Sequence, residues 1–294
     1  MSRNLIYFLT KSDLQRNSMI RSLLIAAWFI AAFSFMRSEA LADNIPLAGH
    51  RAVYNLSLLR GEGAKAPIQA RGSIVFEFSG SECQGYVQNF HQLTEIQPVE
   101  GQTKFSEVSS ATYEEPLSRD FRFKTATKID NVITDQLEGV ASRENKNLAI
   151  HLKNKASVPL IFQGEILFPT EHLLSILETA IAGRTLLEAR VYDGSGQGDR
   201  IMHTLSIIGK PMVGAPSEKP AQLNELRGLK RWPVVISYFE VGHIDGPPIY
   251  ALSFDLYSNG ISRALKLDYG DFVLSGEMVE LSFSPISKCD LKKN

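Results

Sequence analysis

The stretch Asp193-Gly194-Ser195-Gly196 sets a carboxylate and a hydroxyl together among glycines, as a nucleophilic serine site would. A nucleophile elbow needs Gly-x-Ser-x-Gly between a strand and a helix, whereas Ser195 has glycine directly on both sides and lies between two expected strands. A phosphate-binding loop would need a lysine and a helix start after its glycines, and neither follows. We therefore interpret the stretch as a flexible hairpin loop.

Glu171-His172 is the second pair that could do chemistry, because a carboxylate beside an imidazole can move protons. A glutamate in the first turn of a helix is already explained by its attraction to the positive end of the helix dipole. We expect His172 to be a surface or capping residue. No two histidines have the helical spacing of metal ligands, so we predict no metal site, no cofactor and no enzyme. The six histidines are His50, His91, His151, His172, His203 and His243.

Cys83 and Cys289 are the two cysteines of the chain. A metal site would need further ligands close by, and a redox pair would usually be close in sequence, whereas these two are 206 residues apart (289 − 83). Both lie in the part that we expect to be exported. We therefore predict a structural disulfide between Cys83 and Cys289, formed in an oxidising compartment.

The N-terminus has the features of a secretory signal peptide. Arg16 and Arg21 precede an apolar run from Leu23 to Met36, and Ala40-Leu41-Ala42 offers the small residues that signal peptidase reads. The apolar run is shorter than the roughly 18 residues that a membrane span needs, which argues against an uncleaved anchor. We predict a signal peptide over residues 1–42, cut after Ala42.

Removal of residues 1–42 leaves 26 basic (31 − 5) and 30 acidic (32 − 2) side chains, a net charge near −4. A mildly acidic protein has no basic face with which to displace counterions from nucleic acid, so we exclude that partner. Residues 43–294 are enough for one large β domain and contain no later apolar run that could span a bilayer. Translation from Met1 and from Met19 both remain open.

Most of the exported part alternates apolar and polar residues in short runs about ten residues apart, which predicts an antiparallel meander, sandwich or barrel. Asn259-Gly260 is the strongest signal for a two-residue hairpin turn. The expected strands are 50–60, 73–78, the stretch that follows Cys83, 104–113, 121–127, 135–141, 148–153, 158–167, 185–192, 202–208, 250–256, 265–269 and 273–283.

One convincing helix interrupts these strands after Phe168. We expect Pro169 to close the preceding strand, Thr170 to cap the helix and Gly183 to end it in a left-handed conformation. Apolar residues recur at helical spacing, so the helix should pack one face in or against the sheet. That face contains Leu173, Leu174, Leu177, Ala180 and Ile181.

Residues 210–232 carry three prolines and no strand alternation. We expect a long loop with one helical turn through Leu223, Leu226 and Leu229, and with Trp232 as its anchor. Long loops in compact domains are often functional or mobile, although a surface excursion without a task is equally consistent with the pattern.

Five long blocks of the chain together resemble the EipB family of cell-envelope integrity proteins, formerly a family of unknown function in Gram-negative alphaproteobacteria. They cover nearly all of the exported part in order. The blocks are HRAVYNLSL, GSIVFEFSGSECQGYVQNFHQLTE, FPTEHLLSIL, EARVYDGS and SFDLYSNGISRALKLDYGDFVLSGEMVEL.

The resemblance implies a periplasmic protein folded as a spiral, barrel-like antiparallel β domain, with the helix packed in or against it and a disulfide that matches Cys83 and Cys289. It implies a role in envelope integrity without an assigned reaction. A helical-repeat (TPR-type) envelope protein is one partner to which it points.

Three functions compete at this point. The first is a non-enzymatic envelope factor that binds an envelope protein or a cell-wall partner, which fits the absence of a catalytic pattern. The second is a carrier or sensor of a lipid or other apolar ligand, since a barrel-like sheet around a helix can enclose a cavity. The third is an envelope hydrolase that uses Ser195 or His172.

Cys83→Ser should lower the melting temperature and increase protease sensitivity without removing any specific chemistry. Chain entropy predicts a loss of roughly 4–5 kcal/mol for a loop of this length. Thermal unfolding and limited proteolysis of the wild type and the variant measure it. An unchanged melting temperature would mean that the two cysteines do not form the predicted bond.

Overall fold

The computed structural model describes residues 45–285 apart from 64–65, 117–118, 154–157 and 241–245. The predicted signal peptide and Cys289 lie outside the described residues. None of the helices in the described ranges has the length and apolar character of a bilayer span.

Most of the described residues lie in fourteen strands, which correspond largely to the runs of alternating apolar and polar residues in the sequence. They are β1 (His50–Gly61), β2 (Gln69–Ser81), β3 (Gly85–Gln97), β4 (Lys104–Glu114), β5 (Asp120–Ile129), β6 (Val132–Glu144), β7 (Asn147–Leu152), β8 (Leu160–Gln163), β9 (Leu186–Val191), β10 (Met202–Ile208), β11 (Arg231–Glu240), β12 (Tyr250–Tyr257), β13 (Ser262–Asp268) and β14 (Phe272–Phe283).

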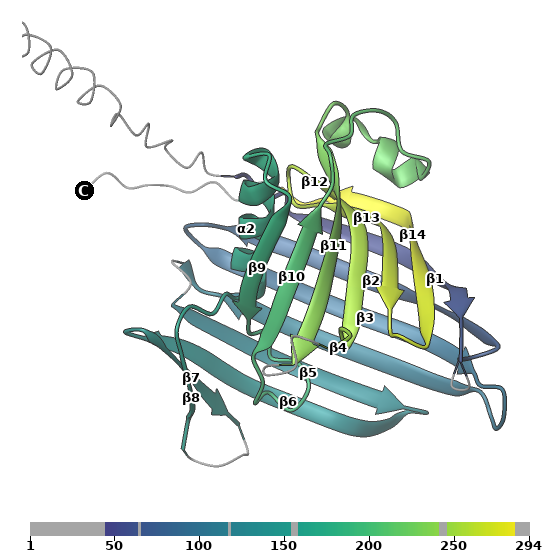
Figure 1. The fold of residues 1–294 in the computed structure, drawn as a ribbon, viewed down its shortest axis with the longest axis horizontal. Coiled ribbons are helices and arrows are strands. Elements are labelled where there is room, and N and C mark those ends of the chain that lie inside the picture. Colours follow the sequence, from purple (N-terminus) through teal and green to yellow (C-terminus); the bar gives the residue numbers. More distant parts are fainter. Residues whose placement is uncertain (1–44, 64–65, 117–118, 154–157, 241–245, 286–294) are drawn as a thin grey trace, which may run out of the picture. The chain divides into compact units, whose positions relative to one another are not determined.

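The strands form one antiparallel sheet in the order β8-β7-β6-β5-β4-β3-β2-β1-β14-β13-β12-β11-β10-β9 (Figure 1). Strands that are consecutive in sequence are also neighbours in the sheet, except β8 and β9, and β1 pairs with β14 near its centre. The two edges are therefore β8 and β9, which are consecutive in sequence. Because these edges do not pair, the sheet is open. The prediction of a mainly β, antiparallel, barrel-like fold with one helix is confirmed.

Three expectations about the strands were wrong in detail. Strand β11 was not predicted, because residues 232–236 are apolar on both faces and follow a proline-rich stretch. The expected strand 158–167 shortens to β8. Four residues, not two, separate β12 from β13, because Gly260 has a positive φ of 87° whereas Asn259 does not, and the buried Ile261 belongs to the core.

Helix α2 (Pro169–Ile181) connects β8 to β9. Phe168, not Thr170, is the N-cap, and Pro169 is the first helical residue rather than the end of a strand. Proline suits that position because its missing N–H would have no partner in the helix. Thr170 is drawn inward instead, since its N–H donates to Glu114 at 2.7 Å. Gly183, with φ of 72°, ends the helix as predicted.

The inner side of α2 packs on β10, β11 and β12. Ile176, Leu177 and Ala180 bury themselves against these strands, whereas Ile181 of the predicted face is exposed. Trp232 is buried in the same cluster, so the expectation that it anchors the end of the loop is confirmed. The cluster's strand residues are Ile208, Trp232, Val234, Ile236, Phe254 and Leu256.

The start of α2 packs on the other half of the sheet. The Phe168 ring stacks on Phe121 of β5 with centroids 5.1 Å apart, and Tyr192 meets Phe123 edge to face at 5.5 Å. Such pairs add about 0.5–1.5 kcal/mol each beyond the area that they bury. The helix is thus held by strands from both ends of the sheet order.

The loop between β10 and β11 folds into two short 3-10 turns, η2 (Lys219–Gln222) and η3 (Asn224–Leu226). It replaces the single helical turn that we expected. The buried Glu218 fixes it: one carboxylate oxygen binds the guanidinium of Arg263 and the other accepts the Met278 N–H at 2.9 Å. A bulge in β14 lies beside Met278.

Glu218→Ala should destabilise the protein by about 3–5 kcal/mol, because it leaves the buried Arg263 charge and the Met278 N–H without that partner. Urea unfolding of the purified protein measures the loss. Glu225→Ala on the same loop, where the side chain is exposed, should change stability by less than about 0.5 kcal/mol. Equal effects of the two substitutions would contradict the role given to Glu218.

Candidate functional site

Residues 164–168, the β8–α2 segment, lie between the two edges of the sheet. On one side, the Gly164 N–H donates to the Lys146 carbonyl at 3.1 Å. On the other side, Leu167 forms a parallel bridge with Val191. The Leu167 N–H donates to the Arg190 carbonyl at 2.8 Å, and the Leu167 carbonyl accepts the Tyr192 N–H at 2.9 Å. The segment therefore spans what we call the edge gap, the space between β8 and β9.

Two cavities open on either side of this segment and share Glu165 and Leu167. The first, of about 400 Å³, faces the turn between β6 and β7, and the second, of about 410 Å³, faces β9. Volumes of this size suit a small ligand or a short piece of a polymer. The first is lined by Arg143, Asn145, Lys146, Asn147, Leu148, Gly164, Glu165, Ile166, Leu167 and Glu171, and the second by Glu165, Leu167, Ser175, Leu187, Glu188, Ala189, Arg190 and His203.

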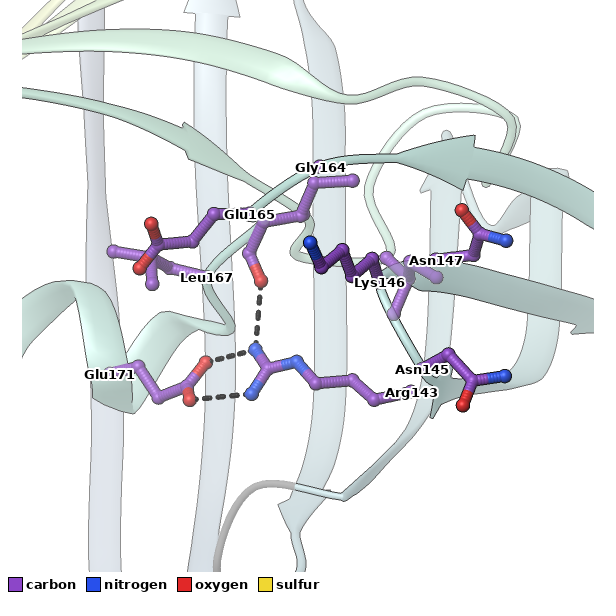
Figure 2. A pocket seen from close by; sticks show the side chains of 10 residues that line it. Arg143, Asn145, Lys146, Asn147, Gly164, Glu165, Leu167 and Glu171 are labelled. Carbon is purple, nitrogen blue, oxygen red and sulfur yellow. Dashed lines mark hydrogen bonds and ion pairs between the residues drawn. The ribbon is translucent and has the colours of Figure 1, made fainter.

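Arg143 of β6 holds the segment and the helix together (Figure 2). Its guanidinium binds both carboxylate oxygens of Glu171 and also donates to the Ile166 carbonyl at 2.8 Å. The same group lies over the Phe168 ring at 4.4 Å. Glu171 in turn accepts the Phe168 N–H at 2.8 Å. Glu171 is thus a structural ion-pair residue as well as a first-turn carboxylate.

The remaining groups of the first cavity are a mixture of charged, polar and apolar side chains. An ammonium, a carboxylate and two amides line it, together with apolar side chains. In the described ranges, no group of three or more His, Cys, Asp or Glu side chains could hold a metal ion. These groups can form hydrogen bonds and ion pairs with a partner of mixed charge.

The two residues considered for hydrolysis are not arranged for it. His172 is buried, not at the surface as expected, because it faces Thr204 of β10, with its Nε2 3.2 Å from the Thr204 hydroxyl. Burial lowers the pKa of His172 to about 4, so the ring is neutral at physiological pH. Ser195 is exposed in a turn in which its own N–H donates to Asp193 at 2.9 Å. Among the described residues, no hydrogen bond connects His172 with Ser195.

Cys83 lies in the exposed turn between β2 and β3, with its Sγ 3.3 Å from the Ser81 hydroxyl. Its predicted partner Cys289 is outside the described residues. The disulfide between them stays a prediction.

Glu114 at the end of β4 carries no sequence pattern that marks it as a site residue. Its side chain is buried, one oxygen accepts the Thr170 N–H, and the other has no hydrogen-bond partner among the described residues. Burial is the main cause that raises the pKa of Glu114 to about 7, and the charge of Glu171 acts in the same direction. The hydrogen bonds from Thr170 oppose it. A carboxyl that titrates near neutrality therefore lies under the first turn of α2.

The comparisons with known proteins agree with one another. A family model described as EipB-like matches residues 41–285. The cell envelope integrity protein EipB of Brucella abortus (strain 2308) is 31% identical over 255 residues, which are 86% of this chain and 90% of that protein. A crystal structure from Brucella abortus, of a beta-barrel-like protein of domain of unknown function DUF1849, matches with a TM-score of 0.76 at 31% identity, over 82% of this chain and 100% of that one.

Glu114→Gln should make the protein more stable than the wild type at pH 8 but not at pH 5. The folded pKa of about 7 exceeds the ordinary value of 4.5, so the wild type loses stability as the pH rises through this window, by up to about 3 kcal/mol. Glutamine keeps an oxygen for the Thr170 N–H and cannot ionise. Urea unfolding at both pH values gives the difference.

Glu107→Gln is the contrasting variant, because hydrogen bonds from His91 and Lys128 lower the pKa of the half-buried Glu107. The ionised Glu107 stabilises the fold at neutral pH, and this stabilisation is lost on acidification. Glu107→Gln should therefore be slightly less stable than the wild type at pH 8. A parallel pH dependence of the wild type and Glu114→Gln would show that Glu114 ionises normally.

Proposed function

Because the chain belongs to the EipB-like family, we propose that it is a non-enzymatic periplasmic factor that maintains cell-envelope integrity by binding an envelope partner. The role comes from the name of its Brucella relative. The compartment comes from the predicted signal peptide and disulfide, since both are typical of exported proteins.

The edge gap is the observation that carries the binding part of the proposal. Two cavities of about 400 and 410 Å³ meet at one short segment. That segment is fixed from both sides by backbone hydrogen bonds and by Arg143. A surface that is already ordered before its partner arrives loses little conformational entropy on binding. The edge gap is therefore the surface that we assign to the partner.

The partner in this proposal is an envelope protein or a cell-wall component. Among envelope proteins, the resemblance of the sequence points to the helical-repeat (TPR) type. Exposed apolar side chains on both edges favour a protein, because such residues are common in protein interfaces when polar residues surround them. Ile161 of β8 and Leu186 of β9 are two of them.

A second candidate is a carrier or sensor of an apolar ligand. One cavity of about 160 Å³ favours it, because its lining includes Leu47, Phe76, Phe78 and Leu173. That volume suits the end of an acyl chain rather than a whole lipid, so a larger ligand would need α2 to move. Mass spectrometry of protein purified gently from periplasm decides: co-purifying lipid that is lost on denaturation supports the carrier.

The envelope role is tested in a strain that lacks the gene, which should become sensitive to detergent and recover with the wild-type gene. A photo-reactive amino acid is then placed at Ile161 or Leu186 on the two edge strands that border the edge gap, or at the exposed Val132, the first residue of β6, as a control. We expect one discrete cross-linked adduct from the first two positions and none from the control.

Two results would overturn the proposal. Growth of the deletion strain in detergent at the wild-type rate would remove the envelope role. Restored growth with adducts of equal yield from all three positions would remove the edge gap as the binding surface.

A further inference from the structure

We propose that the free edge of β9 binds an extended segment of a partner protein by strand addition, with an apolar and a basic side chain beside Leu186 and Glu188. This inference deepens the proposed function and rests on its claim that an envelope protein is the partner.

The backbone of β9 offers hydrogen-bonding groups on its open side. Thr185 accepts the Ile208 N–H at 2.9 Å, so the odd-numbered residues of β9 point their backbone groups toward β10. Residues 186, 188 and 190 then point away from it, because the direction alternates along a strand. The Arg190 carbonyl confirms this parity, since it accepts the N–H of Leu167 outside the sheet. Within the described part of the chain, β9 pairs with β10 alone and has a single bridge on its other side.

The cavity of about 410 Å³ lies along this open side. Leu187, Glu188, Ala189 and Arg190 of β9 line it, and Glu165, Leu167 and Ser175 close it from the β8–α2 segment and the helix. A neighbouring strand lies about 4.8 Å away in the plane of a sheet. The Leu167 bridge already occupies this place beside Val191. An incoming strand would continue from that bridge along the rest of β9.

The outward side chains of β9 set the pattern of the incoming strand. Leu186 starts an exposed apolar row that continues through Ile207 of β10 to Val235 of β11, with exposures of 55, 51 and 37%. Glu188 is the next outward side chain. Arg190 is already engaged, because its guanidinium donates to the Gln163 carbonyl at 2.6 Å and its own carbonyl accepts the Leu167 N–H. Directly opposed side chains in a sheet stabilise it when they are both apolar or oppositely charged, by about 0.2–1 kcal/mol a pair. An apolar residue beside Leu186 and a basic residue beside Glu188 follow.

A second copy of the chain fits this edge less well. In the antiparallel register of two β9 strands centred on residue 188, one Glu188 faces the other, and like charges in that position repel. The register that would set Glu188 against Arg190 of the second copy is blocked, because the Leu167 N–H already binds the Arg190 carbonyl. The incoming segment therefore has a different sequence, and its main-chain groups provide the shared part of the affinity.

The test uses pentapeptides with threonine at the first, third and fifth positions and valine and lysine between them, each labelled with fluorescein. One peptide has valine before lysine, which suits parallel addition, and one has the reverse order. The exchanged peptides have glutamate in place of lysine. Fluorescence anisotropy with the mature full-length protein should show that one of the first two binds, and that its exchanged counterpart binds about tenfold more weakly.

Two substitutions at Glu188 test its backbone N–H and its side-chain charge separately. Glu188→Pro removes the outward N–H without touching the hydrogen bonds to β10, so the protein should keep its melting temperature while peptide affinity falls at least about tenfold. Glu188→Ala keeps that N–H, so it should bind the exchanged peptide and the original peptide about equally. If Glu188→Pro fails to fold, N-methylation of the peptide residue that donates to the Glu188 carbonyl should weaken binding in the same way. That residue is the lysine in antiparallel addition and the threonine after it in parallel addition.

Three results would overturn strand addition. One is no binding by any peptide up to about 1 mM, which corresponds to −4.1 kcal/mol. Another is binding that neither Glu188→Pro nor N-methylation changes. The third is self-association of the protein that Glu188→Pro abolishes, which would make a second copy the occupant. Adducts at Ile161 and Leu186 that survive Glu188→Pro would leave the proposed function standing while this inference fails.

Discussion

The bidentate pair between Arg143 and Glu171 is the contact on which the helical end of the molecule depends. It joins β6, near one edge of the sheet, to the first turn of a helix whose inner face packs on strands near the other edge. An arginine fork is suited to this because it binds a carboxylate with two parallel hydrogen bonds and still has donors left. The donor that reaches Ile166 fixes the segment that carries both cavities.

Buried polar groups also determine how the irregular parts of the chain lie on the sheet. Glu114 binds the backbone of the first turn of α2, and Glu218 binds the backbone of β14 where a bulge frees an N–H. In both cases a carboxylate from one element satisfies an N–H of another, which would otherwise be buried at a cost of about 1–3 kcal/mol. These contacts specify position, while the apolar clusters supply most of the stabilisation.

The sequence alone predicted most strands and the helix, because alternation along a half-buried strand and the spacing of Leu177 and Ala180 are local signals. It did not predict β11, whose residues are apolar on both faces. Nor did it predict the role of Glu114, which lies 56 residues from the N–H that it accepts. Threonine is a residue type that often caps helices, but Thr170 lies inside the helix, where its N–H binds Glu114. Contacts between distant residues leave no periodic trace in a single sequence.

The pairing of β1 with β14 has a consequence for how the protein folds. Arg51 and Glu280, which meet across this pair, are 229 residues apart in sequence. The centre of the sheet therefore forms only after the C-terminal strand has emerged from the ribosome or from an export channel. Contacts between such distant residues slow folding, because closing the long intervening loop costs entropy before the strand pairing stabilises the chain. A chain that folds this late stays unfolded while it emerges, which is the state that the predicted export would need.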